Sequence, residues 1–172
     1  MRQIIIQSAL LTFVVFVGGQ AVAQSAKPIC TEDSRACMIA TATTYLDALV
    51  AHDASKVPFA PDAKRTEQGR ITALVEEALR ESTKLQPDMS EHANTRFFVD
   101  EETNNVIAFT LLRIPGTKRE ANRKTYSDDL KIKVCTVHLA ERFKVEAGLI
   151  TEIEALFTIE QGTDQGISNW PD

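Results

Sequence analysis

Two long runs of alternating side chains occupy the last third of the sequence and constrain the fold more than any other feature. Residues 130–146 read LKIKVCTVHLAERFKVE and residues 149–160 read LITEIEALFTIE, with Ala147 and Gly148 between them. Apolar residues at nearly every second position, on both sides of a two-residue turn, predict an antiparallel hairpin. A hairpin of this length must bury one of its faces, so other parts of the chain have to cover that face.

A second, shorter hairpin is predicted on the N-terminal side of the first. Residues 95–100 read TRFFVD and residues 105–114 read NVIAFTLLRI, and a short polar segment separates them. Both runs are rich in aromatic and β-branched residues, which favour strands. The two hairpins together predict a mainly antiparallel sheet in the second half of the chain.

Two helices are predicted ahead of these strands. Apolar residues recur at helical spacing over residues 34–52, which indicates a helix with one buried stripe. The prolines of VPFAP, residues 57–61, exclude a helix there, and a short strand is predicted over 63–66. Apolar residues at helical spacing then predict a second helix over 67–84. Helices followed by antiparallel strands are the order of an α+β fold, in which the helices cover one face of a curved sheet.

The register of the long hairpin decides which side chains face the core. If Ala147 and Gly148 form the turn, the pairing places His138 opposite Phe157. A β-bulge in so long a pair would shift the register by one residue and exchange the faces of part of it. Without a bulge, the predicted core-facing set is Val134, Thr136, His138, Ala140, Arg142, Ile153, Ala155, Phe157 and Ile159.

The first 23 residues are predicted to be a signal peptide, which leaves residues 24–172 as a single domain. Arg2 provides a basic start, residues 4–17 are apolar, and Ala21-Val22-Ala23 is a small-residue cleavage site. The apolar run is too short for a good membrane span. We therefore expect a periplasmic or secreted protein.

Charge excludes several classes of partner. The net charge of −5 argues against nucleic acid, and against an anionic membrane surface once the signal is cleaved. The basic stretch Lys118–Lys124 is interpreted as a solvated loop. No three His, Asp or Glu residues fall at metal-ligand spacing and no Gly-rich phosphate loop occurs in the sequence, so no cofactor is implied.

The cysteines fit an oxidising compartment. Cys30 and Cys37 flank the start of the first predicted helix, and a disulfide between them would tether the N-terminus. Cys135 remains, in a predicted strand, and is interpreted as a small buried apolar side chain.

Two stretches resemble a known superfamily. FKVEAGLITEIEALF, residues 143–157, is similar to the SnoaL-like branch of the nuclear-transport-factor-2-like superfamily, and residues 30–69 resemble an uncharacterised SnoaL-like subfamily. The likeness extends over about residues 30–160. It implies a cone, in which a strongly curved antiparallel sheet is closed by N-terminal helices around an apolar cavity. Relatives include isomerases, cyclases, dehydratases, epoxide hydrolases, lyases and non-catalytic binding modules, so the resemblance alone does not choose a reaction.

Five residues of the predicted cavity face are candidates for the site. His138 is the only histidine in a predicted strand and is the candidate proton carrier; it could instead be a core histidine bonded to a hydroxyl. Tyr45 could donate a hydrogen bond to an oxyanion or simply pack. Arg142 could hold a substrate oxygen or only extend to water, and Phe157 and Thr136 are expected to contact the substrate.

Two glutamates on the opposite predicted face need an explanation. Glu141 and Glu154 are placed directly across from each other, and unpaired carboxylates at that spacing repel. They could be neutralised at a subunit interface, or form an acid–base pair if the assigned faces are inverted. The resemblance adds that SnoaL-like hydrolases and cyclases commonly carry an aspartate where this chain has Ala155, which puts hydrolysis or aldol cyclisation by that route in doubt.

The sequence thus predicts an exported, cofactor-free lyase or isomerase that acts by general acid–base chemistry. The expected substrate is a small apolar molecule, which can be aromatic. His138 and Tyr45 are the predicted catalytic residues, with Arg142, Phe157 and Thr136 binding substrate. The alternative is a non-catalytic module that binds a small molecule or forms a homodimer through the outer face of the sheet. A third interpretation is a domain with a filled core and no pocket.

Overall fold

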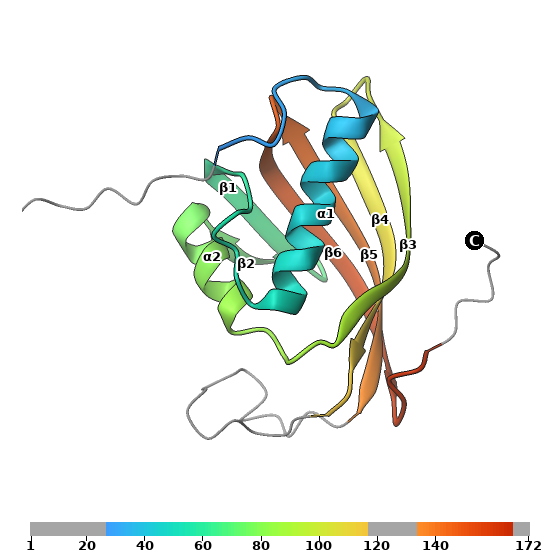
Figure 1. Cartoon of the computed structure of the whole chain (residues 1–172). Coiled ribbons are helices and arrows are strands. Elements are labelled where there is room, and N and C mark those ends of the chain that lie inside the picture. The colour runs from blue at the N-terminus through green and yellow to red at the C-terminus, as the bar shows by residue number, and fades with distance from the viewer. Residues whose placement is uncertain (1–26, 117–133, 167–172) are drawn as a thin grey trace, which may run out of the picture.

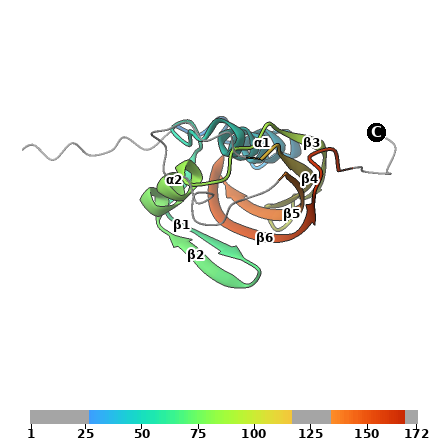
Figure 2. The same ribbon diagram turned by 90° about the horizontal axis from the view of Figure 1, so that it is seen from below.

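Six strands form one curved sheet that wraps around helix α1 (Figures 1 and 2). The computed structural model describes residues 27–116 and 134–166, so the predicted signal peptide and the basic stretch Lys118–Lys124 lie outside the described residues. The strand order is β2-β1-β6-β5-β4-β3. The strands are β1 (Phe59–Glu67), β2 (Arg70–Leu74), β3 (Glu91–Asp100), β4 (Asn105–Ile114), β5 (Cys135–Glu146) and β6 (Leu149–Gln161).

The α+β cone and both predicted hairpins are confirmed. β3 pairs antiparallel with β4, and β5 with β6, around the turns that the sequence indicated. One pairing differs from the expected antiparallel sheet, because β1 runs parallel to β6, with Arg65 beside Ile153 and Glu67 beside Ala155. This pairing brings residues from the N-terminal half of the chain next to the C-terminal hairpin.

Helix α1 (Arg35–Ala51) covers the concave side of the sheet, as predicted (Figure 1). The Ser34 hydroxyl accepts a hydrogen bond from the Cys37 backbone N–H and caps the N-terminus. His52 ends the helix in a left-handed conformation. The buried stripe of α1 consists of Cys37, Met38, Thr41, Ala42, Tyr45, Leu46, Ala48 and Leu49.

The second predicted helix is wrong in its first half. Residues 70–74 form strand β2, and helix α2 covers only Glu76–Lys84. Gln68 and Gly69 both have positive φ angles and make the tight turn that joins β1 to β2. The apolar residues at helical spacing that suggested a helix are largely exposed on this edge strand and just after it: Ile71, Leu74 and Val75.

A β-bulge in β6 makes the observed register of the long hairpin differ from the predicted one by one residue. Val145 pairs with Ile150, but Lys144 pairs with Glu152, so Thr151 is an extra residue in β6. Beyond this point every partner in β5 is displaced by one residue. Phe157 therefore lies opposite Leu139 instead of His138. The predicted inner face of β6 is correct, whereas the predicted inner face of β5 is inverted.

The expected disulfide is present. Cys30 and Cys37 are bonded, with their Cα atoms 5.8 Å apart, and fix the N-terminal segment to the start of α1. The carbonyl oxygen of Cys30 lies so close to Gly148 that a Cβ there would meet it at 1.8 Å. Glycine is thus required in the β5–β6 turn, which packs beneath the bridged segment. Neither described helix is long and apolar enough to cross a membrane.

Candidate functional site

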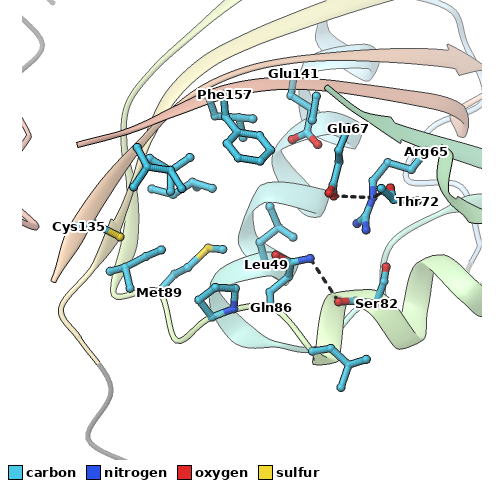
Figure 3. Close-up of a pocket in the computed structure, with 18 of the residues that line it drawn as sticks. Leu49, Arg65, Glu67, Thr72, Ser82, Gln86, Met89, Cys135, Glu141 and Phe157 are labelled. Atoms are coloured by element: carbon cyan, nitrogen blue, oxygen red, sulfur yellow. Dashed lines mark hydrogen bonds and ion pairs between the residues drawn. The ribbon is translucent and has the colours of Figure 1, made fainter. Parts of the chain in front are cut away.

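A cavity of about 1030 Å³ opens between α1, the segment after α2 and the inner face of the sheet (Figure 3). Its presence contradicts the interpretation of the domain as a filled cone. Apolar side chains make most of its wall, among them Leu49, Met89, Leu112, Val137, Leu139, Phe157 and Ile159. Its polar lining residues are Tyr45, Arg65, Glu67, Thr72, Ser82, Gln86, Glu141 and Gln161.

Arg65 organises the polar end of the cavity. Its side chain is buried, and its Nε donates to the Thr72 hydroxyl at 3.0 Å and lies 3.1 Å from Glu67 Oε1. Its Nη1 donates to the Tyr45 hydroxyl at 3.2 Å. Burial by itself lowers the pKa of Arg65, but Tyr45 and Glu67 outweigh it and raise the pKa above its ordinary value. Arg65 is a permanent cation whose charge the Glu67 carboxylate balances inside the site.

Glu141 is the unusual group. It is 2% exposed, it lines the cavity from β5, and its strand neighbours on either side are Ala108 and Ala155. Its Oε2 has no hydrogen-bond partner among the described residues. Burial raises the pKa of the Glu141 carboxyl to about 8; Arg65 opposes this rise and Glu67 adds to it. The carboxyl therefore carries a proton at neutral pH and presents an unused hydrogen-bonding group inside the cone.

Tyr45 connects α1 to this polar end. It is buried and packs edge-on against Phe143, with ring centroids 5.3 Å apart, and against Phe59 at 6.1 Å. Burial, followed by the proximity of Glu141, raises the pKa of the Tyr45 hydroxyl. The hydroxyl stays neutral, accepts from Arg65 and can donate its own proton. Tyr45 thus combines the two roles weighed for it, packing and a hydroxyl at the cavity.

The sequence matches one known family over residues 31–157, described as Domain of unknown function (DUF8021). The chain belongs to this family. No curated protein shows significant sequence similarity to it. For a DUF8021 protein, the site therefore has to be understood from its own residues.

Solved structures share the fold of this DUF8021 chain. The epoxide hydrolase/cyclase-like enzyme SalBIII, described with a role in pyran ring formation in the polyether salinomycin, has a TM-score of 0.60 at 11% identity and covers 76% of this chain and 100% of its own. A candidate polyketide cyclase from Xanthomonas campestris pv. campestris has a TM-score of 0.54 at 18% identity, over 74% of this chain and 93% of its own. A candidate isomerase from Bacillus subtilis has a TM-score of 0.53 at 12% identity, over 72% and 87%. At these identities the likeness establishes the SnoaL/NTF2-like cone and nothing about the reaction.

His138 and Arg142 do not face the cavity of the DUF8021 domain, contrary to the prediction. The His138 side chain is 40% exposed, and its Nε2 lies 3.0 Å from Glu160 Oε2 on the outer face. Arg142 contacts the carboxylates of Glu152 and Glu154 at 3.0 and 3.1 Å on the same face. The bulge is the physical reason, because it changes which β5 side chains lie beside the apolar face of β6.

Of the other two predicted substrate-binding residues, one lines the cavity and one does not. Phe157 lines the cavity, as expected. Thr136 is buried but does not line the cavity; its hydroxyl donates to the Thr163 carbonyl and accepts from the Gly166 N–H, so it anchors the turn after β6. Dimerisation through the outer face stays a prediction; that face exposes the side chains of Phe98, Phe109 and Leu156.

Sequence reasoning missed Arg65 and Glu67 and named Glu141 only for the case of inverted faces. A local signal for Glu141 was available. The odd positions of β5 are Cys135, Val137, Leu139, Glu141, Phe143 and Val145, so Glu141 is the one charged residue in an apolar row. Its partner across the ladder is Ala155, the position at which the resemblance leads one to expect an aspartate. At this pair of positions the carboxyl is on β5 and the alanine on β6.

Proposed function

We propose that this DUF8021 chain is a cofactor-free isomerase or lyase that uses general acid–base chemistry on a small, largely apolar molecule held in the cone cavity. One observation carries the proposal: Glu141 is a buried, proton-bearing carboxyl with an unpartnered oxygen in a mostly apolar cavity. Solved structures of the same fold are described as cyclase-like or as a candidate isomerase, so the proposed reaction type is compatible with the fold, which does not choose it.

The two cavity carboxyls are suited to opposite roles. Glu141 is protonated at neutral pH and can donate to a substrate oxygen as that oxygen gains negative charge. The Glu67 carboxylate lies 3.1 Å from the Arg65 Nε at the same end of the cavity, where it can accept a proton from carbon. The Tyr45 hydroxyl, already bonded to Arg65, can donate a second hydrogen bond to the same developing charge.

The reaction begins with two proton transfers within the site. Glu67 removes a proton from the carbon next to the carbonyl carbon, and Glu141 gives its proton to the carbonyl oxygen, which produces an enol. In an isomerisation, Glu67 returns its proton at a different carbon while the enol oxygen returns its proton to Glu141 and the carbonyl re-forms. In an elimination, the enol oxygen likewise returns its proton to Glu141, a new carbon–carbon double bond forms, and the leaving group departs with the electron pair of its bond and takes up the proton held by Glu67.

We also propose that the protein is exported, as its N-terminal sequence predicts. The Cys30–Cys37 disulfide supports this, because such bonds persist in oxidising compartments. Secretion can be tested by fractionating cells that express the full chain and by measuring the mass of the mature N-terminus.

The experiment that tests the function is a conversion screen in deuterated water. Mixtures of small apolar carbonyl compounds are incubated with the wild type, and NMR and mass spectrometry follow deuterium uptake and new products. We expect exchange or conversion of at least one compound and a loss of about 100-fold or more with Glu141→Gln. Glu154→Gln, which changes a carboxylate on the outer face, should keep wild-type activity. Compounds that bind the wild type without exchange or conversion would support the binding-module alternative instead.

A further inference from the structure

We infer that the cone cavity selects neutral molecules that carry a carbonyl or a similar acceptor oxygen at one end of an apolar body, and that it rejects the corresponding carboxylates. This inference rests on the proposed function, because it names the substrate class of the same cavity. Three observations support it: the Arg65 and Glu67 charges offset each other, the Glu141 Oε2 has no hydrogen-bond partner among the described residues, and the polar residues gather at one end of the cavity.

The charges of the cavity are already balanced. Among the described lining residues the charged or ionisable carboxyl and guanidinium groups are Arg65, Glu67 and Glu141. Glu67 lies 3.1 Å from the Arg65 Nε and offsets its charge. A carboxylate ligand would give up its hydration on entering the cavity, and no cation without a partner among the lining residues would compensate that cost. The ligand would also lie near two glutamates. An ammonium ligand would lose its water in a site that already holds the Arg65 cation.

Glu141 supplies what a neutral acceptor needs. The side chain is 98% buried and its Oε2 has no partner among the described residues, whereas the alanines that flank it on β4 and β6 offer only small side chains. A protonated carboxyl has one O–H donor. A ligand carbonyl next to it would satisfy that donor, and an apolar ligand of the same shape would leave it unsatisfied.

The cavity also has two unlike ends (Figure 3). Arg65, Glu67, Thr72 and Glu141 gather at one end, and Cys135 and Met89 lie at the other. Phe157 lies along the wall between the polar and the sulfur-bearing ends. With a volume of about 1030 Å³, the cavity has room for a bicyclic body in addition to the polar head group.

The discrimination depends on pH in a defined direction. The titratable groups around Glu141 are Tyr45 on α1 and Arg65 and Glu67 on β1, while its strand neighbours on β4 and β6 are alanines. Burial raises the pKa of Glu141 to about 8, and Glu67 adds to the rise while Arg65 reduces it. Above that pH the donor is lost and a negative charge appears, so affinity for a carbonyl falls.

Four probes with one ring system test the inference: 2-acetylnaphthalene, 2-ethylnaphthalene, 2-naphthoate and 1-(2-naphthyl)ethylamine. Ligand-observed NMR titrations give their dissociation constants with the wild type at about pH 6.5 and about pH 9, on either side of the Glu141 pKa. At the lower pH we expect the ketone to bind about tenfold or more tightly than each of the other three. At the higher pH its advantage over the ethyl compound should shrink, because Glu141 has lost its proton.

Three variants test whether Glu141 is the source of the preference for the ketone. Glu141→Gln keeps an N–H donor that does not titrate, so the ketone preference should persist at both pH values. Glu141→Leu removes this donor and should shrink the preference over 2-ethylnaphthalene to what the Tyr45 hydroxyl alone provides. Glu154→Gln on the outer face should behave as the wild type.

Several results would overturn the inference. They are a carboxylate or amine that binds as tightly as the ketone, equal binding of the ketone and the ethyl compound, or no binding of the ketone at millimolar concentration. None of these measurements uses turnover. A clear ketone preference without any deuterium exchange would therefore refute the proposed catalysis and leave the substrate class standing, whereas conversion of ionised substrates would do the reverse.

Discussion

Replacement of Glu141 by glutamine should stabilise this protein at neutral pH and leave its stability almost unchanged in mild acid. The folded state binds a proton at Glu141 up to about pH 8, while the unfolded chain releases it near the ordinary value of 4.5. Between those two pH values the folded state holds more protons than the unfolded state, so the free energy of unfolding falls as pH rises. Glutamine has nearly the shape of the protonated acid and needs no proton.

The magnitude follows from the two pKa values. At pH 7 the unfolded glutamate lies 2.5 pH units above its ordinary pKa of 4.5, and it must regain a proton in order to fold. At about 1.36 kcal/mol per unit, this protonation costs on the order of 3 kcal/mol, which the glutamine variant avoids. Near pH 4.5 the difference should shrink to a few tenths of a kcal/mol, because about half of the unfolded chains then already carry the Glu141 proton.

Urea unfolding followed by circular dichroism at about pH 5, 6 and 7 measures the difference directly. All other titrating groups are common to the two proteins, so they cancel in the comparison. Glu81→Gln is the matched control, since Glu81 is exposed on α2 and forms a surface ion pair with Lys84; it should change stability by about 0.5 kcal/mol or less. Equal stability of wild type and Glu141→Gln at pH 7, or a gain that does not depend on pH, would refute the reasoning.

Three further predictions concern the surrounding structure. Reduction of the Cys30–Cys37 bridge should lower the free energy of unfolding by about 2–3 kcal/mol, as measured by urea unfolding with and without reductant. Tyr45→Phe keeps the ring contacts but removes a partner of the buried Arg65, so a loss of about 1–2 kcal/mol is expected in the same assay; an unchanged midpoint would contradict this. His138→Ala should change unfolding by about 0.5 kcal/mol or less and leave probe binding and conversion intact, because that side chain lies on the outer face. Reduced conversion by His138→Ala would contradict this expectation and support the catalytic role that the sequence predicts for His138.

The sequence was most informative where structure is local. The stripe of α1, both hairpin turns and the inner face of β6 follow from patterns a few residues long, and all of them are confirmed. The polar end of the cavity is different, because Arg65 and Glu67 reach it through the parallel pairing of β1 with β6, and no local pattern specifies that pairing. Pairings between segments so far apart in the chain depend on the whole sheet.

The two errors have separate causes. In residues 67–84 the helical spacing of Ile71, Leu74 and Val75 predicts a helix, but a tight turn at Gln68-Gly69 starts an edge strand, and these three side chains are exposed on it or just after it. In the long hairpin, the register predicted from the turn holds only as far as Thr151, where the bulge lies. The alternation within β5 alone would have placed Glu141 inside and His138 outside, without any assumption about its partner strand.

The bulge also indicates where proteins of this architecture can change length without changing their chemistry. Because Thr151 is a single extra residue in β6, loss of its codon would remove the bulge and leave Glu152 opposite Lys144, as it is now. Ile153, Ala155 and Phe157 would keep their inward places on the wall of the cavity. A one-residue insertion or deletion in the regular part of the strand would instead exchange inward with outward residues from that point on. Alignments across the family should accordingly be made with a gap permitted at this position, since an ungapped comparison would equate inward with outward residues.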